Sequence, residues 1–274
     1  MKKSCLLAVS AIGILAVLIF PQLVSARTSG ARGGPGARMY DLKYHNINQV
    51  SLPVTNFGQF GQSLAGSAGD DWPAGSGNPY IFGAGIWVAT ILGGDTICIN
   101  GYNTVGAGQE FMPGPVEHNA NHLLDPNAHP EDRLYFSTNP ADTAEWPLVD
   151  GAGNKIFISE QDAYALFNGH EPSVQVAQEN PLPITVTQLS FAWNAPINQN
   201  MIFMLYTVRN DTSFALTDLY VGVGSDLDVG MADDDLVGLD IGRSLGWTCT
   251  LNQEAGWDAP PPYYVGYRFL QCPK

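Results

Sequence analysis

The amino-acid sequence predicts an all-β protein, an antiparallel β-sandwich or jelly-roll-like fold with one short helix and long irregular loops. Glycine occurs 30 times and proline 19 times, while charged residues make up only 14% of the chain. Long amphipathic helices need more charge and fewer helix breakers. Apolar runs of strand length recur along the chain, separated by turn residues. Only one segment carries both a helix start and a helix stop.

The N-terminus predicts a secretory signal peptide at residues 1–26. Lys2 and Lys3 precede an apolar run from Cys5 to Leu23, and Val24-Ser25-Ala26 supplies small residues for cleavage. The alternative is a membrane anchor, because the run approaches the roughly 17–25 residues that span a bilayer. Pro21 and the small-residue exit favour cleavage. We therefore expect a secreted protein, extracellular or on the cell surface, with no transmembrane segment in the mature chain.

The mature chain divides by composition into two parts. Residues 27–44 begin with RTSGARGGPGAR, which has no apolar anchor, and predict a flexible leader. Residues 45–274 predict one β-rich extracytoplasmic domain.

Strands are expected in the first half of that domain at residues 51–60 and 79–92. The second run is apolar at both alternating positions, which predicts a central strand buried on both faces. Gly93-Gly94-Asp95 then turns the chain into a hairpin strand at 96–99. Short strands are expected at 133–137 and 155–158.

The predicted helix covers residues 159–168. Ser159 is a suitable N-cap, Asp162 falls in the first turn, and Asn168-Gly169 supplies the stop.

Strand patterns are clearer in the second half, at residues 184–193, 201–208, 216–224 and 263–270. In the first of these, Ile184 and Val186 share one parity, whereas Leu189 and Phe191 share the other. This shift near Thr187-Gln188 predicts a β-bulge.

Charge limits the partners. The chain has a net charge of −14, and removal of residues 1–26 takes away two lysines and no acid, giving −16. A nucleic-acid partner needs a basic surface and is not expected. The balance fits an exported protein or one that gathers cations. Cys98, Cys249 and Cys272 remain after cleavage. A disulfide between Cys249 and Cys272 and three buried or free thiols are the two alternatives.

Six aspartates within residues 226–240 form the main candidate metal site. They are Asp226, Asp228, Asp233, Asp234, Asp235 and Asp240. Calcium takes about 6–8 oxygen ligands, and crowded carboxylates repel each other without a cation. The spacing differs from an EF-hand, since the twelfth position from Asp226 is Val237. The alternative is a solvated acidic loop.

Other chemistry has weaker support in the sequence. His118 and His122 are four residues apart, but Asn119 replaces the glutamate of a zinc-hydrolase motif, and nearby prolines oppose a helix. Exposed tryptophans could stack on sugars or fill core gaps; the candidates are Trp72, Trp146 and Trp257. Carboxylates for glycoside hydrolysis could come from Glu110, Asp132, Glu145 or Glu160.

Several segments together resemble a family. They include Phe82-Gly83-Ala84-Gly85-Ile86-Trp87-Val88, Pro130-Glu131-Asp132-Arg133-Leu134-Tyr135-Phe136, Asp226-Leu227-Asp228-Val229-Gly230 and Tyr264-Val265-Gly266-Tyr267. Over residues 45–274 the chain resembles the N-terminal region of large, uncharacterised secreted bacterial proteins, which often carry a C-terminal type IX secretion sorting domain. The resemblance implies export and surface display, and no activity. The chain stops at Lys274 without a sorting domain, so truncation at that end is one expectation.

Two functional hypotheses follow. The first is a secreted or surface-displayed, non-catalytic β-domain, stabilised by calcium, that is adhesive or contacts polysaccharide or other cell-surface components. The alternative is an extracellular hydrolase acting on glycans.

Overall fold

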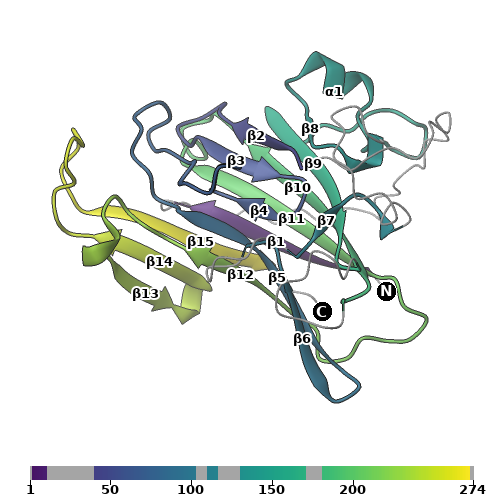
Figure 1. Cartoon of the computed structure of the whole chain (residues 1–274). Coiled ribbons are helices and arrows are strands. Elements are labelled where there is room, and N and C mark those ends of the chain that lie inside the picture. Colours follow the sequence, from purple (N-terminus) through teal and green to yellow (C-terminus); the bar gives the residue numbers. More distant parts are fainter. Residues whose placement is uncertain (1, 11–39, 103–109, 117–129, 171–180, 272–274) are drawn as a thin grey trace.

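The computed structural model describes residues 2–10, 40–102, 110–116, 130–170 and 181–271, with residues 2–10 as backbone only (Figure 1). Two antiparallel sheets stack face to face, which confirms the predicted all-β, sandwich-like fold.

The larger sheet has nine strands in the order β13-β14-β15-β1-β11-β10-β9-β7, with β8 pairing β9. Its strands are β1 (Lys2–Ser10), β7 (Met112–Pro113), β8 (Tyr135–Phe136), β9 (Gln161–Asn168), β10 (Ile184–Ala192), β11 (Met201–Asn210), β13 (Leu236–Asp240), β14 (Leu245–Thr250) and β15 (Tyr263–Gln271).

The smaller sheet has six strands in the order β12-β5-β4-β3-β2, with β6 pairing β5. They are β2 (Leu42–His45), β3 (Leu52–Thr55), β4 (Gln59–Phe60), β5 (Gly83–Leu92), β6 (Asp95–Asn100) and β12 (Tyr220–Asp226). The helical elements of the described residues are α1 (Pro140–Ala144) and the 3-10 turns η2 (Pro130–Asp132), η4 (Ala232–Asp234) and η5 (Ile241–Arg243).

The main hydrophobic core lies between the two sheets. Val54 and Ile86 from the smaller sheet and Val186 and Ile202 from the larger one are all fully buried there. Burial of such side chains contributes about 1.5–3 kcal/mol each, so this layer dominates the stability of the fold.

A second cluster covers the outer face of the larger sheet. It contains Tyr135, Trp146, Leu148, Tyr164, Leu189 and Phe191. The larger sheet is therefore the middle layer, and the segment around α1 caps it (Figure 1).

The predicted helix at 159–168 is wrong, because residues 161–168 form strand β9. Every residue of β9 except Leu166 is buried. The strand pairs with β10 on one side and with β7 and β8 on the other. The carboxylate of Asp162 does accept backbone N–H groups, from Ile158 and Ser159, but it closes a turn before a strand. A helix cap and this turn use the same residues, and burial on both faces decides for the strand.

The predicted β-bulge in β10 is also wrong. The strand pairs in unbroken register with β9 and β11. Its inner face carries the buried polar residues Gln188 and Ser190, while Leu189 on its outer face enters the second cluster. The parity of the apolar residues shifts because the two faces contact different cores.

Several boundaries differ from the expectations. The predicted strand at 51–60 is a hairpin of β3 and β4, with Gly58 in the left-handed region at φ 84°. Strand β5 covers residues 83–92 of the strand predicted at 79–92, and the predicted burial of both faces is wrong, since Trp87 is 36% and Ile91 48% exposed. Residues 155–158 form only a bridge, Val149 to Lys155. Strand β2 begins inside the segment predicted as a leader and ends one residue after it, at His45.

The N-terminal segment predicted as a signal peptide supplies strand β1, which lies between β11 and β15 in the middle of the larger sheet. This placement belongs to the uncleaved chain, and cleavage after Ala26 stays a prediction. Among the described residues, no helix is long and apolar enough to span a bilayer.

Candidate binding pocket and acidic loop

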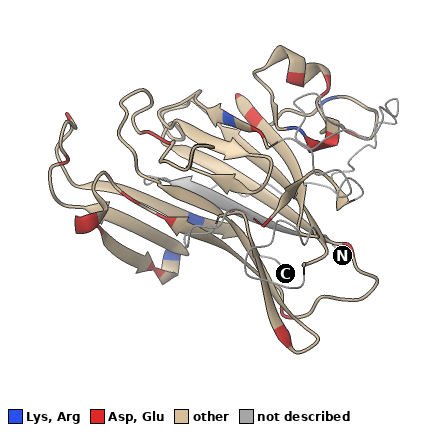
Figure 2. Ribbon diagram, in the orientation of Figure 1, with Lys and Arg blue, Asp and Glu red and all other residues tan. Residues whose placement is uncertain are grey.

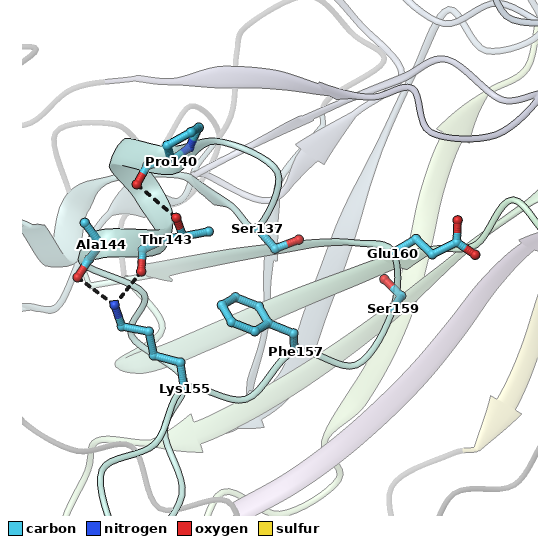
Figure 3. Close-up of a pocket in the computed structure, with 8 residues that line it drawn as sticks. All are labelled: Ser137, Pro140, Thr143, Ala144, Lys155, Phe157, Ser159 and Glu160. Carbon is cyan, nitrogen blue, oxygen red and sulfur yellow. Dashed lines mark hydrogen bonds between the residues drawn. The ribbon is translucent and has the colours of Figure 1, made fainter.

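A shallow pocket of about 600 Å³ lies in the segment that caps the outer face of the larger sheet. Figure 3 shows Phe157 in the middle of it, with Lys155 and α1 on one side and Ser159 and Glu160 on the other. The remaining lining residues are Ser137, Pro140, Thr143 and Ala144.

A buried carboxylate fixes α1 above the sheet. Asp142 is 1% exposed and accepts hydrogen bonds from Lys43 Nζ at 2.7 Å, Arg133 Nη2 at 2.9 Å and the backbone N–H of Phe136 at 2.9 Å. Two cations and an amide offset the cost of burying this charge. Because α1 has only five residues, this anchor and its Asn139 cap hold it in place.

A second carboxylate shapes the opposite wall. Asp162 is 1% exposed and accepts the backbone N–H groups of Ile158 at 2.5 Å and Ser159 at 2.8 Å. The Ser159 hydroxyl also donates to it. The backbone N–H of Asp162 donates to the Ser137 hydroxyl at 2.8 Å. Burial raises the pKa of Asp162, although these donors oppose the shift. The wall is therefore organised before any ligand arrives.

Phe157 is the aromatic platform of the pocket. Its side chain is 47% exposed, whereas Trp146 behind it is 3% exposed. The two ring centroids lie 5.2 Å apart with an interplanar angle of 39°. The indole N–H of Trp146 donates to the carbonyl of Ile156 at 2.9 Å, which locks the supporting ring. A rigid apolar face is thus presented to solvent with little rotamer freedom left to lose on binding.

Polar groups surround the exposed ring. Lys155 Nζ donates to the carbonyls of Thr143 at 2.6 Å and Ala144 at 2.9 Å, at the C-terminal end of α1. Glu160 is exposed at the opposite rim. An apolar platform with acceptors and donors at its edge suits a ligand that is apolar on its face and hydroxylated at its rim.

The acidic loop lies elsewhere, between β12 and β13. Figure 2 marks acidic residues along this and other loops and at strand ends, while most of the ribbon of the described strands belongs to uncharged residues. Asp226 accepts a hydrogen bond from the Tyr102 hydroxyl at 3.2 Å, and Asp235 accepts one from Val229 N at 3.0 Å. Asn252 Nδ2 donates to Asp234 at 2.5 Å.

Burial and neighbouring negative charge act together on two of the predicted ligands, Asp228 and Asp235. Burial and the nearby charge of Asp226 raise the pKa of Asp228. Burial also raises the pKa of Asp235, and Asp228, Asp234 and Glu254 add to the shift. Neighbouring carboxylates therefore add to the effect of burial at both positions.

Glu254 is the member that sequence reasoning missed. It lies between β14 and β15, is 5% exposed, and accepts a hydrogen bond from Met231 N at 3.0 Å. A Cβ at Gly230 would lie 2.3 Å from its carboxyl carbon, so only glycine lets it approach. No local pattern could indicate this contact, because the partners are 23 residues apart.

The six predicted ligands do not all converge. Asp233 is exposed. Asp240 instead pairs with Arg243: its carboxylate accepts hydrogen bonds from Arg243 Nη1 at 2.5 Å and from the backbone N–H of Arg243 at 3.0 Å. Among the described side chains, no three of the His, Cys, Asp and Glu type are already placed around one point as metal ligands. The Oδ1 atoms of Asp234 and Asp235 are buried without a hydrogen-bond partner, and these two free acceptors suit a hard cation.

The carboxylates considered for glycan hydrolysis are scattered. Glu110 is 2% exposed and accepts from the side chain and N–H of Asn100. Asp132 is fully buried beside Gly114, and Glu145 pairs with Arg133. Of the four, only Glu160 lines the pocket.

Of the tryptophans suspected of sugar contact, Trp146 is buried, and Trp72 and Trp257 are partly buried against the main core. Trp146 lies under Phe157, Trp72 donates to Asn200 Oδ1 at 2.9 Å, and Trp257 packs against Tyr80 and Tyr263. His118 and His122 lie outside the described residues, as does Cys272, while Cys98 and Cys249 are free thiols.

Fold and pocket together define an all-β sandwich with an aromatic-floored, polar-rimmed surface pocket. No family model matches the chain, and comparisons with curated proteins and with solved structures find no match.

Proposed function

We propose that this protein is a secreted or surface-displayed, non-catalytic β-sandwich that binds polysaccharide at the Phe157 pocket. The observation that carries the proposal is the half-exposed ring of Phe157, supported by buried Trp146 and bordered by Lys155 and Glu160.

Sugar chemistry fits this arrangement. A pyranose ring has an apolar C–H face that stacks on an aromatic ring, and its hydroxyls project from the edge toward hydrogen-bonding groups. The pocket supplies Glu160 as an acceptor and the hydroxyl of Ser137 at its wall. The pocket is open and shallow, which suits one stretch of a long chain better than an enclosed small molecule.

The geometry favours binding over hydrolysis. Glycoside hydrolysis uses two carboxylates on opposite sides of the scissile bond. The described lining of the pocket includes one, Glu160. The basic group across from it, Lys155, is engaged with the carbonyls at the end of α1.

Affinity electrophoresis through gels that contain single soluble polysaccharides tests the proposal. At least one plant, fungal or bacterial polysaccharide should retard the protein. Phe157→Ala should weaken that retardation about tenfold, because one stacking contact contributes up to about 1.5 kcal/mol.

Phe214→Ala is the matched control. Phe214 is 51% exposed, close to Phe157, but lies on the loop after β11. Equal loss of retardation in both variants, or no retardation of the wild type by any polysaccharide, would contradict a sugar-binding role for the pocket.

We further propose that calcium stabilises the acidic loop, with Asp228, Asp234 and Asp235 as ligands and Glu254 beside them. Support comes from the raised pKa values of Asp228 and Asp235 and from the two unpartnered oxygens. The ion would neutralise the loop and take no part in a reaction.

A further inference from the structure

The candidate pocket borders a further aromatic ring at the end of β10. Strands β9 and β10 pair antiparallel up to Gln161 opposite Ala192. Glu160, at the pocket rim, and Trp193 are the next residues along these two strands, so the register places them opposite each other. A hydrogen bond from the backbone N–H of Ala192 to the Ser159 hydroxyl, at 3.2 Å, ties the two segments together. Trp193 therefore adjoins the Glu160 side of the pocket.

Trp193 lies on the same face of the larger sheet as the pocket. Its ring packs against the second cluster, with its centroid 6.2 Å from that of Phe191 and 5.4 Å from that of Phe203. The same cluster contains Trp146, the ring that supports Phe157. Strand β9 lies between β8 and β10, so the start of β9, with Glu160 at the pocket rim, separates the pocket from Trp193.

Trp193 is supported in the same way as Phe157. Phe191 beside it is 5% exposed, while Trp193 itself is partly buried. The Trp193 carbonyl accepts a hydrogen bond from Asn48 Nδ2 at 3.3 Å, and Asn48 is 6% exposed. The next residue, Asn194, is exposed and adds an amide. An aromatic ring backed by a buried ring, with polar groups at its edge, thus occurs twice on this face.

The charges near the two rings favour an uncharged ligand. Figure 3 shows the Glu160 side chain extending away from Phe157, on the side of the rim that borders Trp193. Lys155, the cation of the described lining, donates to two carbonyls at the end of α1. The chain as a whole has a net charge of −14. Carboxylate or sulfate groups on a bound chain would lie beside Glu160, where like charges repel.

We propose that the binding site extends from Phe157 past Glu160 to Trp193, and that it takes a stretch of an uncharged polysaccharide with one sugar stacked on each ring. This inference rests on the proposed function and adds to it a second stacking residue and a ligand class. A chain that reaches both rings makes two linked contacts, whereas a short oligosaccharide makes one. Affinity should therefore increase with chain length.

The polysaccharide that retards the wild type in affinity gels supplies the probes. Its partial hydrolysis gives oligosaccharides of increasing length, and titration calorimetry measures their affinities. The affinity of the wild type should rise up to the length that spans both rings, a result that needs no variant. Trp193→Leu keeps an apolar side chain against Phe191 and Phe203 but has no flat ring.

Trp193→Leu should lose the increase with length and bind the longest oligosaccharides about tenfold more weakly than the wild type. Trp193→Phe, which restores an aromatic ring, should recover most of this affinity. The double variant Phe157→Ala/Trp193→Leu should lose about a hundredfold, because the two rings contact different sugars.

Carboxymethylation of the same polysaccharide tests the ligand class. The modified chain keeps its backbone and gains negative charge, so it should retard the wild type less than the unmodified chain does. The difference should shrink in Glu160→Gln and at high salt. Retardation by anionic polysaccharides alone, or stronger retardation by the carboxymethylated chain, would overturn the assignment to uncharged polysaccharides.

The same measurements separate this inference from the proposed function. If no polysaccharide retards the wild type, both are wrong. If Phe157→Ala weakens binding, Trp193→Leu does not, and short and long oligosaccharides bind equally well, then the pocket alone binds sugar and the extension to Trp193 is wrong.

Discussion

Asp70 and His45 are buried ionisable side chains with opposite dependence on pH. Asp70 is 8% exposed and accepts the N–H groups of Ile81 at 2.9 Å and Tyr80 at 3.3 Å. Burial raises its pKa to about 7 despite these donors. His45 lies 2.7 Å from the Ser190 hydroxyl and 3.2 Å from Gln161 Oε1, and burial lowers its pKa to about 4.

Asp70→Asn should make the protein more stable than wild type at pH 8 and not at pH 4. Folded Asp70 holds its proton up to about pH 7, whereas the unfolded side chain releases it near 3.8. Its contribution to stability therefore falls as pH rises between these values, by an amount on the order of 4 kcal/mol. Asparagine keeps an acceptor for Ile81. Urea unfolding of both proteins from pH 4 to 8 measures the difference.

His45→Gln is the opposite control. The folded imidazole stays neutral down to about pH 4, while the unfolded one gains a proton near 6.5. The stability that it contributes is thus lost as pH falls through this window, by about 3 kcal/mol. The variant should therefore be least stable relative to the wild type above pH 6.5, where the wild type has the full contribution of neutral His45. Difference curves that are flat with pH for both variants would show that neither side chain titrates as described.

At the scale of elements, β10 is covered on both faces by different cores. Val186 is fully buried between the sheets, and Leu189 is 4% exposed beneath the outer segment. Val186→Ala and Leu189→Ala should each destabilise the protein by about 1–4 kcal/mol, because each leaves a cavity in packed surroundings. Guanidinium unfolding of both variants, monitored by tryptophan fluorescence, gives the two values.

Thr187→Ala, on the same strand and only partly buried, is the comparison variant. A solvent-facing substitution changes stability by less than about 0.5 kcal/mol. If Leu189→Ala were as mild as Thr187→Ala, the outer cluster would not be a stabilising core.

The elements show where local patterns stop being informative. Strands β5, β6, β11 and β15 were predictable because their apolar runs are uninterrupted and bounded by turns. Strand β9 was not, since Ser159 and Asp162 form a turn that looks like a helix cap in sequence. Strands β13 and β14 were missed because Gly238 and Gly246 interrupt them; Trp247 packs where a Cβ of Gly238 would be, at 2.1 Å.

For the whole molecule, composition was enough to predict the class of fold, and distance along the chain limited the prediction of the sites. The Phe157 pocket depends on Asp142 meeting Lys43, 99 residues away, and on Trp146 supporting the ring. The crowded aspartates of the acidic loop could be recognised in the sequence. The approach of Glu254 to this loop and the ion pair between Asp240 and Arg243 depend on the folded structure.

The acidic loop joins the two sheets, so a cation there would act on the whole molecule. Asp226 ends β12 of the smaller sheet, whereas Asp235 precedes β13 and Glu254 precedes β15 of the larger one. Adding calcium at ten times its Kd should stabilise the fold by about 1.4 kcal/mol and raise the Tm by about 3–6 °C. Extracellular calcium modules have Kd values of about 10⁻⁴–10⁻³ M, so millimolar calcium and then chelator are the conditions for thermal melts.

A double variant, Asp228→Asn/Asp235→Asn, should separate repulsion from binding. Both carboxylates have raised pKa values in the folded protein, so their charges oppose folding at neutral pH when no ion is present. The variant should therefore melt higher than wild type in chelator and show no response to calcium. Asp233→Asn/Asp240→Asn removes the same charge from the same loop, at an exposed site and at the Arg243 pair, and should keep the calcium response. Identical melts of the wild type in calcium and in chelator would leave only a solvated acidic loop.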